Sequence, residues 1–189
     1  MSKRFSWTAA AALLSTLAPA AIGAQQQPAP TTPPATAPAA PAPPACSGPE
    51  YRQFDFWIGD WDVKLPNGKV AGTNSIKSIL GGCALQESWQ GSGNINGHSF
   101  NIYDATAKSW HQTWVDNAGS LLNLNGGIQD GKMVLSGDSK DEKGTTVTNR
   151  ITWTRIDADH VRQLWESSSD GGKTWEIAFD GMYTRKASS

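Results

Sequence analysis

The chain has 189 residues, of which 38% are hydrophobic and 17% charged, and its formal net charge at pH 7 is -1. This length suits one domain, or one domain with a small appendage. The near-neutral charge argues against a nucleic-acid-binding protein, because a phosphate backbone is met by clustered Lys and Arg. The nine tryptophans exclude a disordered chain, since so much apolar surface would not stay in water.

Residues 1–24 have the composition of a secretory signal peptide. Lys3 and Arg4 precede an uncharged run rich in Ala and Leu, and small residues follow at Gly23 and Ala24. A basic start, a short apolar run and a small-residue cleavage site are the three parts of such a peptide. We therefore expect cleavage after Ala24, with Ala20 as the second choice. We also expect a periplasmic or secreted protein with no transmembrane segment after processing.

Residues 25–45 are almost entirely Pro, Ala, Thr and Gln, and hold most of the chain's 11 prolines. Proline fixes φ and lacks an N–H group, so we expect a disordered, extended tether here. A spacer that holds the domain away from a surface or a partner fits this composition, and so does a leader with no partner. The globular domain is expected to span residues 46–189.

The two cysteines, Cys46 and Cys83, predict one disulfide, because a pair of Cys residues normally joins in an oxidising compartment. This bond would clip the segment after the tether onto the strand beginning at Ala84. It would contribute roughly 3–4 kcal/mol by constraining the unfolded chain. Two free buried thiols are the alternative. The three His residues are too scattered for a metal site, and we expect neither a metal nor a cofactor.

From Tyr51 onward, turn signals recur at short intervals and divide the chain into about ten segments rich in Trp, Val, Ile, Thr and Tyr. Only residues 54–59 could form a short helical turn. Consecutive strands joined by tight turns form an antiparallel sheet, which removes its edges by closing. We therefore predict an all-β fold, a single antiparallel up-and-down barrel of about ten strands. A two-sheet sandwich is the chief alternative. The turn signals are Pro66-Asn67-Gly68, Gly81-Gly82, Gly91 to Gly97, Ala105 to Lys108, Asn117 to Gly119, Asp130-Gly131, Lys140 to Gly144, Asp157 to Asp159 and Asp170 to Gly172.

One face of five predicted strands is apolar or aromatic at its ends and polar near its middle. The polar members of these faces are Asn74, Glu87, Gln112, Asn149 and Gln163. The tryptophans that share the faces are Trp89, Trp110, Trp114, Trp153 and Trp165. The face of the second strand also includes Val70, and the last strand gives an apolar face of Trp175, Ile177, Phe179 and Tyr183.

This face pattern predicts a ligand pocket inside the barrel. Burying one amide without a partner costs ~1–3 kcal/mol, so the polar groups must bond to one another, to water or to a ligand. They are neighbours only if the sheet closes. We expect the tryptophans to form the wall and the polar ring to orient a small hydrophobic or aromatic ligand. A filled barrel with a hydrogen-bonded plug is the alternative, and Trp rings beside amides suit carbohydrate as well.

Glu87 is the only acid on these inward faces, and burial would raise its pKa. A carboxyl group of this kind can act as a general acid or base, so an isomerase or hydrolase using Glu87 is a second hypothesis. A third is an envelope protein-interaction module, built on the tether and the surface hairpins. The sequence does not indicate the oligomeric state.

The histidines do not complete a catalytic set. His111 and His160 fall on the outward phase, and no Ser lies in the strand–turn–helix context of a nucleophile. His98 shares a face with Phe100 and Ile102 and is a candidate to cap the mouth of the barrel.

Residues 168–175 match the pattern S-x-D-x-G-x-T-W, called an Asp-box, which resembles the hairpin repeats of sialidases and related propellers. Those folds carry one copy per blade, and here there is a single full copy, so a propeller is not predicted. We expect Asp170 to have a structural role, accepting backbone N–H groups across the turn.

Residues 54–63, Phe-Asp-Phe-Trp-Ile-Gly-Asp-Trp-Asp-Val, resemble the opening motif of an uncharacterised family of exported bacterial domains. That family is similar to calycins, the superfamily of lipocalins and fatty-acid-binding proteins. The resemblance extends over residues 81–85, Tyr103-Asp104 with Trp110, and residues 170–175, and so covers most of residues 54–183. It implies a lipocalin-like binding barrel but no reaction. In lipocalins a Gly-x-Trp near the first strand closes one end of the barrel, so the resemblance implies that Trp61 is a plug.

Overall fold

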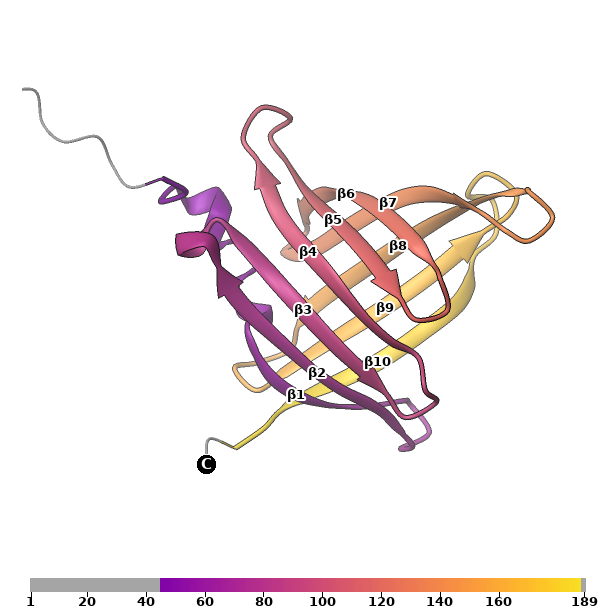
Figure 1. The fold of residues 1–189 in the computed structure, drawn as a ribbon, viewed down its shortest axis with the longest axis horizontal. Helices are drawn as coiled ribbons and strands as arrows, with labels where there is room; N and C mark the ends of the chain where they lie inside the picture. The colour runs from indigo at the N-terminus through magenta and orange to yellow at the C-terminus, as the bar shows by residue number, and fades with distance from the viewer. Residues whose placement is uncertain (1–44, 188–189) are drawn as a thin grey trace, which may run out of the picture. The chain divides into compact units, whose positions relative to one another are not determined.

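The structure, a computed structural model, describes residues 45–187. The predicted signal peptide and nearly all of the predicted tether lie outside the described residues. Within them, ten strands close into a barrel (Figure 1). The strands are β1 (Gly59–Lys64), β2 (Val70–Ile79), β3 (Ala84–Gly91), β4 (Asn96–Asp104), β5 (Ser109–Asp116), β6 (Leu121–Gln129), β7 (Lys132–Lys140), β8 (Thr146–Arg155), β9 (His160–Ser168) and β10 (Glu176–Arg185).

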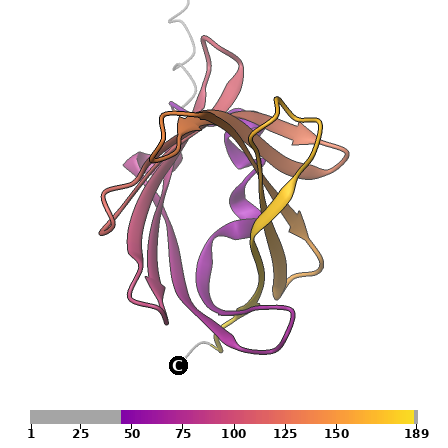
Figure 2. The ribbon, with the colours of Figure 1, turned by 90° about the vertical axis from the view of Figure 1, so that its right-hand side faces the viewer.

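Every strand pairs antiparallel with its neighbour in the sequence, and β1 pairs with β10 to close the ring. The predicted all-β, up-and-down barrel of about ten strands is therefore confirmed, and a two-sheet sandwich is excluded. Helical structure in the described residues is limited to three short 3-10 turns, η1 (Pro49–Arg52), η2 (Asp55–Trp57) and η3 (Leu80–Gly82). Figure 2 shows the ring of strands and the N-terminal turns in purple.

Aromatic side chains from the N-terminal segment fill one end of the barrel. Phe54 and Trp57 are fully buried, and their rings stack with centroids 4.9 Å apart. The Phe54 ring also meets Trp110 at 5.6 Å and Trp153 at 5.1 Å, both edge-on. Such aromatic contacts stabilise the packing beyond the burial of their area. This end of the barrel is therefore solid core.

Trp61 seals the same end. Its indole N–H donates to the Trp57 carbonyl oxygen at 2.9 Å, and the Arg185 guanidinium lies 4.2 Å from the ring centroid. Arg185 in turn donates to the Ile58 carbonyl oxygen at 2.9 Å. Trp61 is completely buried, so it acts as the plug that the resemblance implied.

Cys46 and Cys83 form a disulfide with an S–S distance of 2.04 Å, as predicted. The bond joins the start of the described chain to the residue before β3. It closes a loop over a sequence separation of 37 residues. The segment that carries the aromatic plug therefore lies between two covalently linked points.

The Asp-box forms the β9–β10 turn. The Asp170 carboxylate accepts the backbone N–H groups of Lys173 and Thr174, each at 2.9 Å, and the Thr174 hydroxyl at 2.7 Å. The Trp175 indole N–H donates to the Gly172 carbonyl oxygen at 3.1 Å. These bonds, the Thr174 hydroxyl first, hold the pKa of Asp170 well below its usual range. Asp170 therefore organises the turn.

Two β-bulges place residues that were predicted to face inward on the outer face of the barrel. In β10 the register shifts between Ile177 and Phe179, so Ile177 is 65% exposed while Phe179 and Tyr183 point inward. In β2, Val70 lies beyond a second register shift and is 59% exposed. An extra residue in one strand moves the side chains beyond it to the other face.

Trp175 is also outside the predicted interior. It precedes β10, and the Arg150 guanidinium lies 3.9 Å from its ring centroid. Of the residues that were predicted to face inward from the last strand, only Phe179 and Tyr183 do so.

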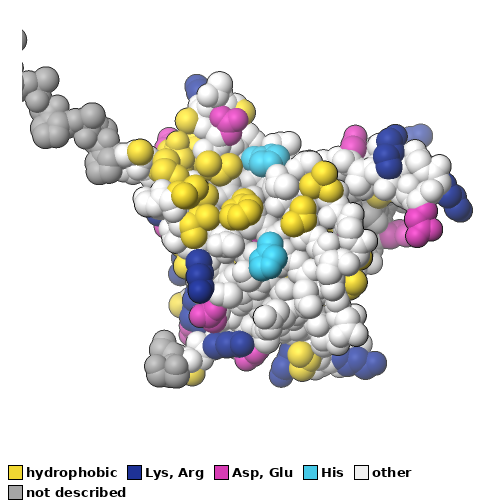
Figure 3. All heavy atoms as spheres, in the orientation of Figure 1, with side chains coloured by type: hydrophobic (Ala, Val, Ile, Leu, Met, Phe, Trp, Pro, Cys, Tyr) yellow, Lys and Arg dark blue, Asp and Glu magenta, His cyan; other side chains and the backbone are white. Residues whose placement is uncertain are grey.

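The prediction that His98 caps the mouth of the barrel is wrong, because the face that it shares with Phe100 and Ile102 is the outer one. They point outward from β4, and Phe100 is 54% exposed. The inward residues of β4 are the alternate ones, including Ser99 and Asn101, both buried. Figure 3 shows hydrophobic side chains gathered on this side of the molecule. Polar side chains inside and apolar ones outside invert the usual pattern of a strand.

Candidate functional site

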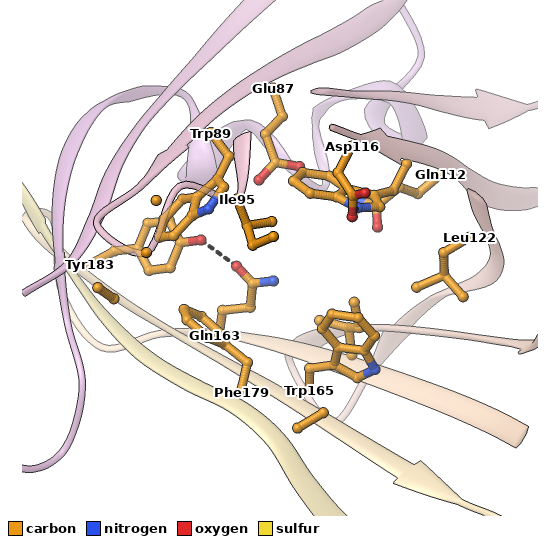
Figure 4. A pocket seen from close by; sticks show the side chains of 16 residues that line it. Glu87, Trp89, Ile95, Gln112, Asp116, Leu122, Gln163, Trp165, Phe179 and Tyr183 are labelled. Atoms are coloured by element: carbon orange, nitrogen blue, oxygen red, sulfur yellow. Dashed lines mark hydrogen bonds between the residues drawn. The ribbon is translucent and has the colours of Figure 1, made fainter. Parts of the chain in front are cut away.

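A cavity of about 370 Å³ occupies the part of the barrel that the aromatic plug leaves free. Its lining includes Gly93 and Ile95 of the β3–β4 turn, so it lies toward the end of the barrel that carries this turn (Figure 4). Seven strands and the β3–β4 turn contribute to its lining. The lining residues are Ala71, Glu87, Trp89, Gly91, Gly93, Ile95, Gln112, Trp114, Asp116, Leu122, Ile151, Gln163, Trp165, Ala178, Phe179 and Tyr183.

Four aromatic side chains, Trp89, Trp114, Trp165 and Phe179, form much of the wall. Trp89 and Phe179 meet edge to face, with centroids 5.9 Å apart. The Trp114 indole N–H donates to Asp116 Oδ2 at 3.1 Å, and that of Trp165 to Asn149 Oδ1 at 2.9 Å. These bonds fix the orientation of both indoles, so the wall is formed before any ligand arrives.

Glycines on adjacent strands make room for two of these rings. A Cβ atom added at Gly97 would lie 2.3 Å from Cζ2 of Trp114, and one added at Gly181 would lie 2.5 Å from Cε1 of Phe179. Each ring therefore lies against bare backbone, where any other residue type would force the ring or the strand to shift. The glycines are needed here for close approach.

Glu87 is the centre of the polar side of the cavity. Its Oε1 accepts a hydrogen bond from Asn74 Nδ2 at 2.7 Å, and its Oε2 accepts one from the Ser99 hydroxyl at 2.6 Å. Glu87 is 4% exposed, and among residues 45–187 it has no salt-bridge partner. Burial raises its pKa above the usual value, although the bonds from Ser99 and Asn74 work in the opposite direction.

The hydrogen bonds continue from Glu87 across β4 to β5. The Ser99 hydroxyl oxygen accepts from Asn101 Nδ2 at 2.9 Å, and Gln112 Nε2 donates to Asn101 Oδ1 at 2.8 Å. The register places Ser99 opposite Glu87 and Asn101 opposite Gln112. Three strands are thus joined by one row of side-chain bonds inside the barrel.

On the other side the network crosses to β10 and β9. Asn74 Nδ2 lies 3.3 Å from the Tyr183 hydroxyl oxygen, and this hydroxyl donates to Gln163 Oε1. Figure 4 shows the bond between Tyr183 and Gln163. Burial, and next the charge of Glu87, raises the pKa of Tyr183 well above its usual value. Tyr183 therefore stays a neutral phenol that donates to Gln163.

Residues 52–185 match the model of a family described as "Protein of unknown function (DUF1579)". The chain belongs to this family. No curated protein matches the chain. The family description assigns no reaction to its members.

The structure brings six of the ten predicted pocket residues onto the lining of the cavity. Those six are Glu87, Trp89, Gln112, Trp114, Gln163 and Trp165. Asn74 lies behind Glu87 as its hydrogen-bond donor. Asn149 bonds to Trp165 and to Ser139 Oγ, so it supports the wall and lies outside the row of bonds through Glu87.

The prediction that Trp110 and Trp153 form part of the pocket wall is corrected. Both are buried against Phe54 in the solid end of the barrel, outside the cavity lining. Alternation fixed the face on which they lie but carried no information on which half of the barrel would be filled. That depends on the path of the segment before β1.

Sequence reasoning missed three polar residues, Ser99, Asn101 and Asp116. Asp116 lies two residues after Trp114 and so on the same face of β5, and extending the alternation of this strand by one step would have predicted it. Asp116 lines the cavity together with Glu87, so the prediction that Glu87 is the only acid on the inward faces is wrong. Burial alone would raise the pKa of Asp116, but hydrogen bonds from Ser120, Trp114 and Ala118 hold it below the usual value.

Proposed function

We propose that the protein binds a small, largely apolar or aromatic molecule inside its barrel. The observation that carries this proposal is the cavity, which has an aromatic wall and a hydrogen-bonded polar side. Its volume of about 370 Å³ lies within the range of small-molecule sites, roughly 300–1,000 Å³. Trp89, Trp114 and Trp165 would enclose the body of the ligand.

The polar group of the ligand would meet Glu87, Gln112 and Gln163. The Tyr183 hydroxyl already occupies Oε1 of Gln163, which leaves the Nε2 group as a donor. Asn101 and Ser99 engage Nε2 of Gln112, which leaves its Oε1 as an acceptor. Fixed polar groups of this kind give a pocket its orientation and specificity.

We also propose that the protein works in the periplasm or outside the cell. Two features support this: the predicted signal peptide, and the disulfide between Cys46 and Cys83, because such a bond persists in an oxidising compartment. No helix in residues 45–187 is long and apolar enough to cross a membrane. Fractionation of the producing cells, with the protein followed by immunoblotting, tests the location.

Calorimetric titration with a panel of small aromatic alcohols tests the binding. Ala178 lines the cavity at the start of β10, and its neighbour Ile177 points outward. Ala178→Phe should therefore weaken binding by about tenfold or more, whereas the matched control Ile177→Phe should bind like the wild type. The proposal fails if the wild type binds no member of the panel, or if the two variants behave alike.

A further inference from the structure

The charged groups around the cavity are all of one sign. Two of the lining residues are acids, Glu87 and Asp116, and Lys, Arg and His are absent from the lining residues. In the described part of the chain neither acid has a salt-bridge partner. A ligand would therefore enter a space in which both carboxyl groups become negative when they ionise and no basic side chain offsets them.

Hydrogen-bond acceptors also outnumber donors on the polar side. Each Glu87 oxygen accepts one bond from its neighbours, and a carboxylate oxygen can accept a second. Within residues 45–187, Oε1 of Gln112 has no hydrogen-bond donor, while its Nε2 group is engaged. Nε2 of Gln163 is the one side-chain amide donor left over for a ligand in this set.

The aromatic wall has the same electrostatic preference. The faces of indole and phenyl rings carry negative potential, and a cation within about 6 Å of a ring centroid is attracted to it. Trp89, Trp114 and Trp165 line the cavity together with Glu87. The faces of these rings would therefore attract a cation, as the carboxylates do.

We propose that the ligand is an organic cation, an apolar or aromatic body that carries a protonated amine. This inference rests on the proposed function and names the chemical class of its ligand. The ammonium group donates to Glu87 and to Gln112 Oε1, and the body lies against the tryptophans. An anion of the same shape is repelled by the two acids.

Binding of a cation should be linked to the protonation of Glu87. The groups that face its carboxyl are Asn74 on β2, Ser99 on β4 and Tyr183 on β10, all uncharged, and His98 lies across the sheet with Nδ1 3.2 Å from the Glu87 carbonyl oxygen. Burial raises the pKa of Glu87 in the free protein. An ammonium group beside it stabilises the carboxylate, so affinity for the cation rises with pH as free Glu87 ionises.

The test uses three probes with one body and different heads: 4-phenylbutylamine, 4-phenylbutan-1-ol and 4-phenylbutanoate. Calorimetry on the wild type should give the tightest binding for the amine, by about tenfold or more over the alcohol, and the weakest for the carboxylate. Between about pH 4 and about pH 8 the amine stays charged, so its affinity relative to the alcohol should rise with pH.

Glu87→Gln should reduce the preference for the amine over the alcohol to about threefold or less, and Glu176→Gln, at an exposed position, should leave it unchanged. If Glu87→Gln does not fold, the pH profile of the wild type decides. Equal binding of amine and alcohol, or a ratio that does not change with pH, overturns the inference and leaves the proposed function standing. If no probe binds, the inference and the proposed function both fail.

Discussion

The Asn74 amide donates to Glu87 Oε1 at 2.7 Å, while its own oxygen, Oδ1, is buried without a hydrogen-bond partner. An unpaired buried acceptor is costly. Turning the amide over would only move the unpaired position from Oδ1 to Nδ2, so the pair keeps one unpaired buried atom in either orientation. Burial favours the neutral form of Glu87 and so raises its pKa.

Glu87→Gln should accordingly fold and should gain stability relative to the wild type as pH rises. A carboxyl whose pKa is raised in the folded state stabilises it fully below the unfolded pKa, and this contribution is lost as pH rises through the folded pKa. The glutamine cannot ionise, so it escapes that loss. Urea unfolding of both proteins from about pH 4 to about pH 9 checks the prediction, and parallel stability curves would contradict it.

Asp170→Asn should lower the melting temperature near neutral pH, and the difference should shrink in acid. The turn bonds hold the pKa of Asp170 below its ordinary value of 3.8, so its contribution is present above that value and lost as pH falls toward the folded pKa. Asp130→Asn, in the exposed β6–β7 turn, is the control. Equal melting temperatures for wild type and Asp170→Asn at neutral pH would refute the structural role.

Gly97→Ala should damage the pocket wall. The added methyl group would lie 2.3 Å from the Trp114 ring, so the indole must move. Overpacking of this kind costs typically about 1–3 kcal/mol, and we expect weaker ligand binding with it. Gly127→Ala is the matched control, because a Cβ atom there meets nothing within 4 Å. Calorimetric titration and urea unfolding compare the two variants. The prediction is wrong if both variants bind the ligand with equal affinity.

Replacing both Cys46 and Cys83 with Ser should lower the free energy of unfolding by about 3–4 kcal/mol, the loop-entropy value for a closed loop of this length. The wild type in reducing buffer should behave like the double variant. Urea unfolding with and without reductant measures both. No change in stability in either case would show that the clip adds nothing to the fold.

The polar side of the pocket could be predicted where alternation alone places a residue. Glu87, Gln112 and Gln163 lie on regular stretches of β3, β5 and β9, and a period of two residues fixes their face. Ser99 and Asn101 were missed because β4 has its polar residues inside. Only the strand register shows that Ser99 lies opposite Glu87 and that Asn101 lies opposite Gln112.

The extent of the pocket could not be predicted. Phe54 and Trp57 belong to a segment without strand periodicity, and they decide that Trp110 and Trp153 become core. The bulge before Phe179 likewise leaves no mark in the alternation of the sequence. The segment before β1 and the bulge in β10 therefore determine which part of the barrel is filled and which part stays open, and neither can be read from strand periodicity.

The most direct test of ligand binding inside the barrel is a crystal structure of the wild-type protein grown with saturating 4-phenylbutan-1-ol. This probe is uncharged, so its binding does not depend on whether the cavity prefers cations. We expect the phenyl ring inside the barrel, against Trp114 and Trp165, with the hydroxyl group toward Gln112 or Gln163. Electron density for the probe on the outer face of β4, beside Phe100, with none in the cavity, would contradict this expectation.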